Sequence, residues 1–202
     1  MPSTYTTQRP HHAITAITSA ALIATLAVAG GLIITGTRDA RTAEVAAPAK
    51  LGYPFTYHGL LGAEQATRVV IEDVIANHLT PAGRQAVTRR YAATPVYGVT
   101  WREQLDQEVA ERRIAVALGG HGGNPYTPAE AGDTVIAQAN VTNSRVDTYT
   151  ENYAETYAFI TANVNNTITT ADHSADQQWT DIITVKLEWT DAGWRVGAWV
   201  VR

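Results

Sequence analysis

The feature that most constrains this chain is an uncharged stretch from Ala13 to Gly36, AITAITSAALIATLAVAGGLIITG. A helix of about 20 apolar residues, rising about 1.5 Å per residue, crosses a hydrocarbon core of about 30 Å. A core helix of a soluble domain normally carries a polar face, and this stretch has none. We therefore predict a transmembrane helix over residues 13–36, preceded by a short N-terminal tail over residues 1–12.

A cleaved signal peptide is the alternative interpretation, because the small residues of Ala43–Ala47 resemble a peptidase site. The apolar cores of signal peptides run for about 7–15 residues, and the longer stretch here favours a retained anchor. Arg9 precedes the stretch, while Arg38 and Arg41 follow it, so the flanking charges nearly balance. Since a short tail before a first hydrophobic segment usually stays inside, we expect a single-pass cell-membrane protein with a cytoplasmic N-terminus and an extracytoplasmic C-terminal domain.

The remaining chain divides into a linker and one domain. Residues 37–61 are rich in Ala, Thr, Pro and Gly without a sustained apolar period, which predicts a linker. Residues 62–202 suit one globular domain. From Lys50 onward the chain has 12 Lys and Arg against 17 Asp and Glu and no basic run, so nucleic acid is not an expected partner. The chain has no cysteine, which excludes disulfides, thiol nucleophiles and cysteine-based metal centres.

Helical signals fill the first half of the domain. The apolar residues of 62–79 share one helical stripe. Thr80–Pro81 suits the start of a second helix, which runs to about Tyr91. Thr100–Glu103, TWRE, forms a capping box, which predicts a third helix from there to Gly119. The solvent-facing side of that third helix is expected to carry Gln104, Glu108, Glu111 and Arg112.

After Pro128 the apolar residues alternate with a period of two, which predicts strands. On the last strand one face carries Trp194, Val196, Ala198 and Val200. Asp191–Gly193 is a hairpin turn in which the glycine supplies the positive φ. Because helices precede strands instead of alternating with them, the domain is predicted to be α+β with an antiparallel sheet. The strands are expected over residues 134–142 with a continuation over 145–150, then 155–164, 179–189 and 194–201.

The late hairpin Trp189–Val196, WTDAGWRV, and the order of helices before sheet resemble a known family. Over about residues 62–202 the chain is similar to the cone-shaped, cystatin-like α+β roll of the nuclear-transport-factor-like superfamily. That resemblance implies about three helices packed on a curved antiparallel sheet of four or so strands.

With an anchor before such a roll, the chain resembles the assembly-factor subunit of type IV secretion and conjugation systems. It is especially similar to uncharacterised anchored proteins of actinobacterial mobile elements. Those proteins share a strand like Arg145–Tyr149 and a late segment like Trp179–Val196. The composition, rich in Ala, Thr and Val, suits a high-GC actinobacterium.

The sequence contains few candidates for chemistry. Its six histidines are His11, His12, His58, His78, His121 and His173. No two of them have the spacing of a zinc site, and no Gly-x-Ser-x-Gly elbow is present, so neither a metal nor a cofactor is predicted. The loop Gly119–Pro125 places His121 between glycines but lacks the Lys-Ser/Thr of a phosphate loop, so we interpret it as a connector from helix to strand.

Asp181 is the candidate acid–base group, because some enzymes on this fold move a proton with an acid or a tyrosine inside the cone. It shares a face of its predicted strand with Trp179. Its expected neighbours are Tyr149, Tyr153 or Tyr157. The interpretation that we favour is structural: Asp181 reaches solvent at the strand end or pairs with Arg195, and no residue is predicted to be catalytic. The tryptophans are interpreted as core and rim of the sheet.

Three functions remain open. The first, which we favour, is a non-enzymatic membrane-anchored scaffold or assembly component of a conjugative transfer apparatus. Its partners would be the membrane and other subunits of a membrane complex, with further copies of the chain as a homo-oligomer. The alternative is a small-ligand-binding or isomerase-like enzyme that uses the cone, and the third is a stalk or sensor. A cavity of roughly 300 Å³ or more with Asp181 facing it would remove the main support for the first.

Overall fold

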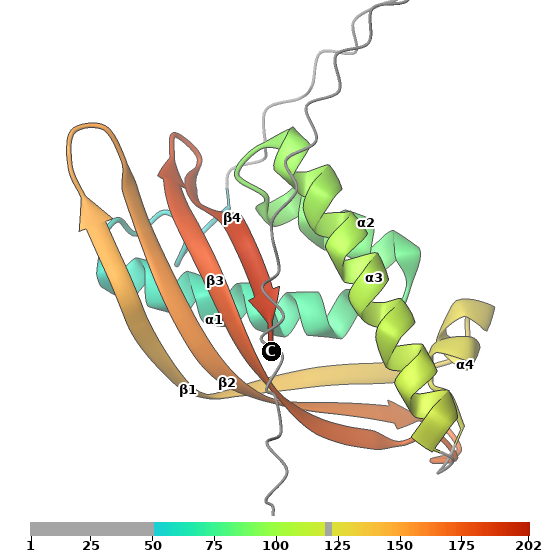
Figure 1. Cartoon of the computed structure of the whole chain (residues 1–202). Coiled ribbons are helices and arrows are strands. Elements are labelled where there is room, and N and C mark those ends of the chain that lie inside the picture. The colour runs from blue at the N-terminus through green and yellow to red at the C-terminus, as the bar shows by residue number, and fades with distance from the viewer. Residues whose placement is uncertain (1–50, 120–122) are drawn as a thin grey trace, which may run out of the picture. The chain divides into compact units, whose positions relative to one another are not determined.

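The structure, a computed structural model, describes residues 51–119 and 123–202, which form four helices and one four-stranded sheet (Figure 1). The helices are α1 (Leu60–Asn77), α2 (Pro81–Tyr91), α3 (Pro95–Gly119) and α4 (Tyr126–Ala131). The strands are β1 (Val135–Glu151), β2 (Thr156–Thr170), β3 (Gln177–Thr190) and β4 (Gly193–Val201). The strands lie in sequence order, and each is antiparallel to its neighbour. The predicted α+β class with an antiparallel sheet is confirmed.

The predicted transmembrane helix over 13–36 and the tail over 1–12 lie outside the described residues. Among the helices of residues 51–119 and 123–202, none combines the length and the apolar character needed to cross a membrane. The predicted linker, 37–61, overlaps the folded part of the chain. Phe55 is only 4% exposed, and its carbonyl accepts a hydrogen bond from the backbone N–H of Trp194 at 2.9 Å. The packed domain therefore begins before residue 62.

The main core lies between α1 and the inner face of the sheet, which curves around α1 in Figure 1. The apolar stripe predicted for the first helix is confirmed, since Val70, Ile71, Val74 and Ile75 are all buried. Each such side chain contributes about 1.5–3 kcal/mol when fully buried. The sheet contributes buried residues at alternate positions of its two central strands: Ala158, Ile160, Ala162, Val164, Ile183, Val185 and Leu187.

The second helix forms as predicted, while the third begins earlier. The Thr80 hydroxyl accepts a hydrogen bond from the Gly83 N–H at 3.1 Å, and Pro81 opens α2. The predicted capping box at Thr100 is wrong, because α3 already begins at Pro95. The Thr94 hydroxyl accepts from the Tyr97 N–H at 3.1 Å, so the same Thr-Pro signal that opens α2 also opens α3. Thr100 lies inside the helix, where its hydroxyl donates to the Val96 carbonyl.

The strands are longer than the sequence predicts. β1 is continuous from Val135 to Glu151, with irregular register near residues 142 and 147. β2 runs to Thr170, six residues past the predicted end. A second, smaller core covers this extension, where Ile168 packs with Leu79, Val109 and Tyr126. Because that cover comes from distant helices, the alternation of residues 165–170 alone could not reveal it.

The inner face of β4 changes halfway along the strand. Trp194 and Val196 face the core as predicted, but Trp199 is 1% exposed and Val200 is 45% exposed. Leu187 pairs with Val196 and Lys186 with Ala198, so Gly197 is an extra residue without a partner. A bulge of one residue exchanges the two faces of a strand, since side chains alternate with a period of two. The predicted inward face through Ala198 and Val200 is therefore wrong.

Candidate functional site

A cavity of about 350 Å³ lies between the end of α1, the middle of α3 and strands β3 and β4. Its apolar wall includes Val74, Leu105 and Ile183, and two indoles, Trp179 and Trp199, add aromatic surface. Its polar lining consists of His78, Glu108, Glu111, Arg112 and Asp181. Ligand pockets in proteins start at about 300 Å³. The cavity therefore meets the size condition that we set for the ligand-binding alternative.

Asp181 faces this cavity from β3 and is 9% exposed. Arg112 donates from Nη2 to both carboxylate oxygens, at 3.1 and 3.3 Å. Asn166 Nδ2 donates at 2.9 Å and Trp179 Nε1 at 2.7 Å to the same Oδ2. The Arg112 guanidinium also lies over the Trp179 ring, 4.3 Å from its centroid. The carboxylate therefore fixes α3 to the sheet, and both of its oxygens are already occupied by donors.

The expected neighbours of Asp181 are elsewhere. Asp181 pairs with Val164 on β2, whereas Tyr157 lies seven positions away along that strand. At about 3.3 Å per residue this is roughly 23 Å. Tyr149 pairs near the same far end of the sheet, and Tyr153 is fully exposed in the β1–β2 turn. The ion pair of Asp181 is made with Arg112, so the predicted pairing with Arg195 is wrong.

Glu108 is the second acid of the cavity. Burial, the largest effect, raises the pKa of Glu108 to about 7, while the nearby Trp199 indole and Arg112 lower it. The buried Trp199 Nε1 interacts with the Glu108 carboxylate. Glu108 forms no ion pair at salt-bridge distance within the part of the chain that the structure describes, because Arg112 is paired with Asp181. A buried indole donor and a largely buried carboxylate thus face each other in this space, and the carboxylate has no cation of its own at salt-bridge distance among the described residues.

His78 closes the cavity at the end of α1. Its Nδ1 contacts the Ile75 carbonyl at 2.5 Å, which makes that nitrogen the donor. Burial lowers the pKa of His78 to about 4, so the imidazole is neutral at physiological pH. Its own carbonyl accepts from the Arg84 guanidinium, and Arg84 pairs with Asp106 on α3. This network joins α1, α2 and α3 directly beside the cavity.

The other histidines do not join this site. His11, His12 and His121 lie outside the described residues, as does the centre of the glycine-rich loop. His58 packs against the Trp189 ring at the opposite end of the sheet from Asp181, and exposed His173 contacts Asp176 in the β2–β3 turn. Within residues 51–119 and 123–202, no three histidine or acidic side chains are grouped so that they could hold a metal ion.

Three residues of the site, Glu108, Glu111 and Arg112, were predicted to face solvent. All three line the cavity. The signal that could have placed Glu108 and Arg112 is their spacing, because they follow Trp101 and Leu105 along one helical stripe. A stripe that changes from apolar to charged residues is easily taken for the edge of a polar face. Here the charged positions remain inside because β3 supplies Asp181 as a partner for Arg112.

Fold and site together define an α+β domain with an acid-lined cavity beneath its longest helix. No family model and no curated protein sequence matches the chain. Among solved structures, the periplasmic domain of DotI is similar at 12% identity and a TM-score of 0.48, over 72% of this chain and 96% of that one. The intermembrane-space region of the chloroplast protein ARC6 is similar at 12% identity and a TM-score of 0.38, over 69% and 95%. Both likenesses are too distant to assign a function, and the relation to nuclear-transport-factor-like proteins stays a prediction.

Proposed function

We propose that this protein is a non-enzymatic, membrane-anchored scaffold or assembly component of a multi-subunit membrane complex. The complex it serves is a conjugative transfer apparatus of the type IV secretion kind. The uncharged stretch 13–36 supports the anchor. The proposed orientation places the N-terminus in the cytoplasm and the domain outside. The observation that carries the proposal is the exposed apolar end of α3.

After Val109, α3 continues to Gly119 without burying another side chain. Ile114 is 60% exposed and Leu118 is 83% exposed in this segment. Grouped exposed apolar side chains commonly mark a surface for another protein. Two ion pairs attach this half of the helix to the domain, Arg112 with Asp181 on β3 and Arg113 with Glu130 on α4. A preformed helix surface loses little conformational entropy on docking, which suits an assembly role.

The test compares membrane extracts that contain the full chain, Ile114→Glu with Leu118→Glu, or the control Ile136→Glu. Ile136 is a half-exposed apolar residue at the start of β1, and its side chain points to the face of the sheet opposite to that of Ala137, which packs in the smaller core with Val109 of α3. We expect the wild-type chain and the control to migrate on native gels in an assembly with a second subunit species, and the double variant to leave it. Transfer of the mobile element should fall at least tenfold in the double variant alone. A chain that migrates alone in all three extracts contradicts the proposal.

The cavity supports the alternative function, a small-ligand-binding or isomerase-like enzyme. Its volume passes the limit of 300 Å³, and Asp181 faces it. An acid–base role would fall to Glu108, since the Asp181 oxygens are occupied by Arg112, Asn166 and Trp179. A carboxyl group with a pKa of about 7 can accept or donate a proton near neutral pH. The scaffold proposal therefore rests on the end of α3 and the anchor, and no longer on a filled cone.

A further inference from the structure

The charges around the cavity are unbalanced. Glu108, Glu111 and Asp181 are its carboxylates, and Arg112 is its one cationic side chain among the described residues. Arg112 is occupied by Asp181 and by the Trp179 ring. His78 does not compensate the remaining acids, because it is buried and neutral near pH 7. The space beside Glu108 therefore favours a positively charged group.

Without a cation beside it, the ionised form of Glu108 is unfavourable in this largely buried position. A carboxylate that is removed from water loses solvation energy unless a counter-charge or hydrogen-bond donors replace the water. The Trp199 indole offers Glu108 a neutral donor but no counter-charge, and Arg112 already pairs with Asp181. A ligand ammonium group beside Glu108 would pair with its carboxylate and stabilise the ionised form.

The walls of the cavity suit an apolar body behind such a group. Val74, Leu105 and Ile183 form an aliphatic surface, and Trp199 contributes an aromatic one. A volume of about 350 Å³ lies at the small end of protein ligand sites, so the occupant is a small molecule and not a peptide chain. Ala115 lines the cavity from the exposed half of α3.

We propose that this cavity binds a small organic amine, whose ammonium group pairs with the Glu108 carboxylate and whose apolar body packs against Trp199 and Leu105. The inference is independent of the assembly role, because that role rests on Ile114 and Leu118 and not on the cavity. Its ligand class follows from an acid without a cationic partner among the described residues and an apolar wall that converge on a single space.

The test uses the full chain in a mild detergent and follows tryptophan fluorescence, with equilibrium dialysis as a second measurement. The probes are butylamine, cyclohexylamine and 2-phenylethylamine. Uncharged 2-phenylethanol and anionic 3-phenylpropanoate serve as comparators of similar shape. We expect at least one amine to saturate with a Kd of about 1 mM or lower at pH 8, and both comparators to bind at least tenfold more weakly. Three amines that fail to saturate at about 10 mM, or comparators that bind equally well, would overturn the inference.

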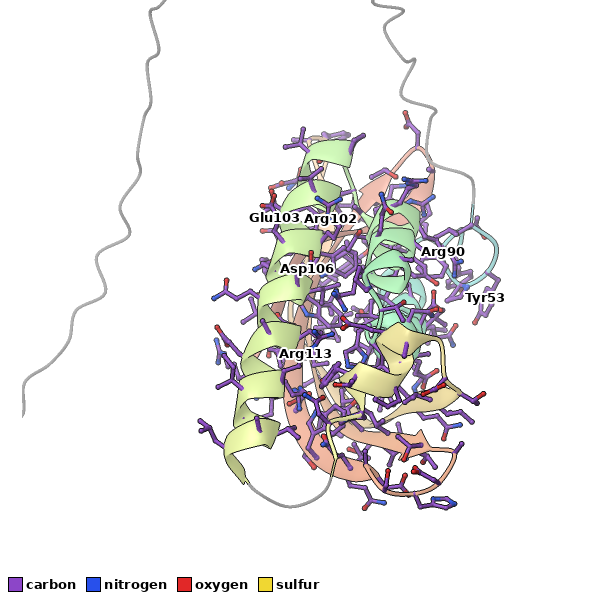
Figure 2. The ribbon with its side chains drawn as sticks, turned by 90° about the vertical axis from the view of Figure 1, so that its right-hand side faces the viewer. Tyr53, Arg90, Arg102, Glu103, Asp106 and Arg113 are labelled. Carbon is purple, nitrogen blue, oxygen red and sulfur yellow. The ribbon has the colours of Figure 1, made fainter. Side chains whose placement is uncertain are left out.

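Two pairs of variants place the binding in the cavity. Glu108→Gln removes the acid, while Glu103→Gln makes the same change on the exposed side of α3, where Figure 2 labels Glu103. We expect a loss of about tenfold or more in amine affinity for the first and less than about twofold for the second. Ala115→Phe should block the cavity, whereas Ala110→Phe, an exposed position that does not line it, should not. Equal binding by all four variants would refute the site.

The pH dependence gives an independent measurement. The titratable groups that line the cavity or act on Glu108 are His78 at the end of α1, Tyr97, Glu111 and Arg112 from α3, and Asp181 from β3. With a Glu108 pKa of about 7, the ionised fraction rises from about one-tenth at pH 6 to about nine-tenths at pH 8. Amine affinity should rise about tenfold over this range in the wild-type chain. It should stay flat in Glu108→Gln, and a flat profile in both chains contradicts the ion pair.

Discussion

At the scale of single residues, His78 and Glu108 show how one cavity moves two pKa values in opposite directions. Burial lowers the pKa of His78 to about 4 and raises that of Glu108 to about 7. The cause is the same in both, since removal from water disfavours the charged form of each group. The folded state therefore favours a neutral imidazole and a neutral carboxyl group. Between about pH 4.5 and 6.5, a rise in pH therefore increases the stability that His78 contributes and decreases the stability that Glu108 contributes.

His78 should make the stability of the folded protein depend on pH. An unfolded histidine has a pKa near 6.5, so between about pH 4 and 6.5 the unfolded chain binds a proton that the folded chain does not. His78 therefore contributes stability that is complete above about pH 6.5 and is lost as the pH falls towards 4. Replacement by Gln should remove this dependence, and it should reduce the loss between pH 7 and 4.5 by about 2 kcal/mol. Urea unfolding across that range measures the slope of unfolding free energy against pH. Equal slopes for the wild-type and variant proteins would show that His78 does not cause the dependence.

At the scale of elements, the start of α3 separates two local signals that look alike in the sequence. The Thr94 hydroxyl caps the helix by accepting from the Tyr97 N–H, whereas the Thr100 hydroxyl donates to a carbonyl inside it. Thr94→Ala should cost about 1 kcal/mol of unfolding free energy, the usual value of a lost N-cap. Thr100→Ala should change it by less than about 0.5 kcal/mol, since it replaces an exposed residue with a better helix former. Chemical denaturation measures both changes. A larger loss of unfolding free energy in Thr100→Ala than in Thr94→Ala would support the capping box at Thr100.

Two glycines with similar backbone angles allow a second comparison. Gly193 has a φ of 91° in the β3–β4 turn, and Gly132 has a φ of 89° after α4. A Cβ on Gly193 would lie 2.3 Å from the Phe55 carbonyl oxygen, while a Cβ on Gly132 would meet nothing within 4 Å. Gly132→Ala should cost about 1 kcal/mol for the left-handed conformation alone. Gly193→Ala should cost at least about 2 kcal/mol, because the contact with Phe55 must also break. Equal losses in thermal unfolding would show that the close approach is unimportant.

At the scale of the whole molecule, the segment before α1 closes the domain. Phe55 stacks on Tyr91 with ring centroids 5.4 Å apart, and the Trp194 indole N–H donates to the Tyr57 carbonyl at 3.0 Å. Tyr53, in this segment, lies on the side of the domain away from α3 in Figure 2. These contacts join the start of the described chain to its last hairpin, so a domain cut at the predicted linker boundary loses part of its core.

The prediction compares domains of residues 51–202 and 62–202. Loss of a buried phenylalanine side chain costs about 3–5 kcal/mol, and the shorter domain also leaves the Trp194 hydrogen-bond donors without their carbonyl partners. We expect the shorter domain to be less stable by about 3 kcal/mol or more, or to fail to fold. Urea denaturation measures the difference. Equal stability would mean that residues 51–61 act as the linker that the sequence predicted.

The local elements of this protein follow from short-range patterns in its sequence. The stripe of α1, the Thr-Pro start of α2, the alternation of β3 and the turn at Gly193 all depend on residues within a few positions of one another. Such patterns express backbone preferences and a single buried face, and both can be read without knowing the partner. For this reason the α+β class followed from the sequence.

The residues that form the cavity come together through long-range packing. Arg112 and Asp181 are 69 positions apart, and their pairing turns a residue predicted to face solvent into part of the interior. The bulge at Gly197 brings Trp199 to the inner face, where it meets Glu108. The packing of Phe55 under Trp194 likewise depends on two distant ends of the domain. Such long-range contacts depend on how whole elements pack. The periodic pattern of one segment does not specify which element packs against it.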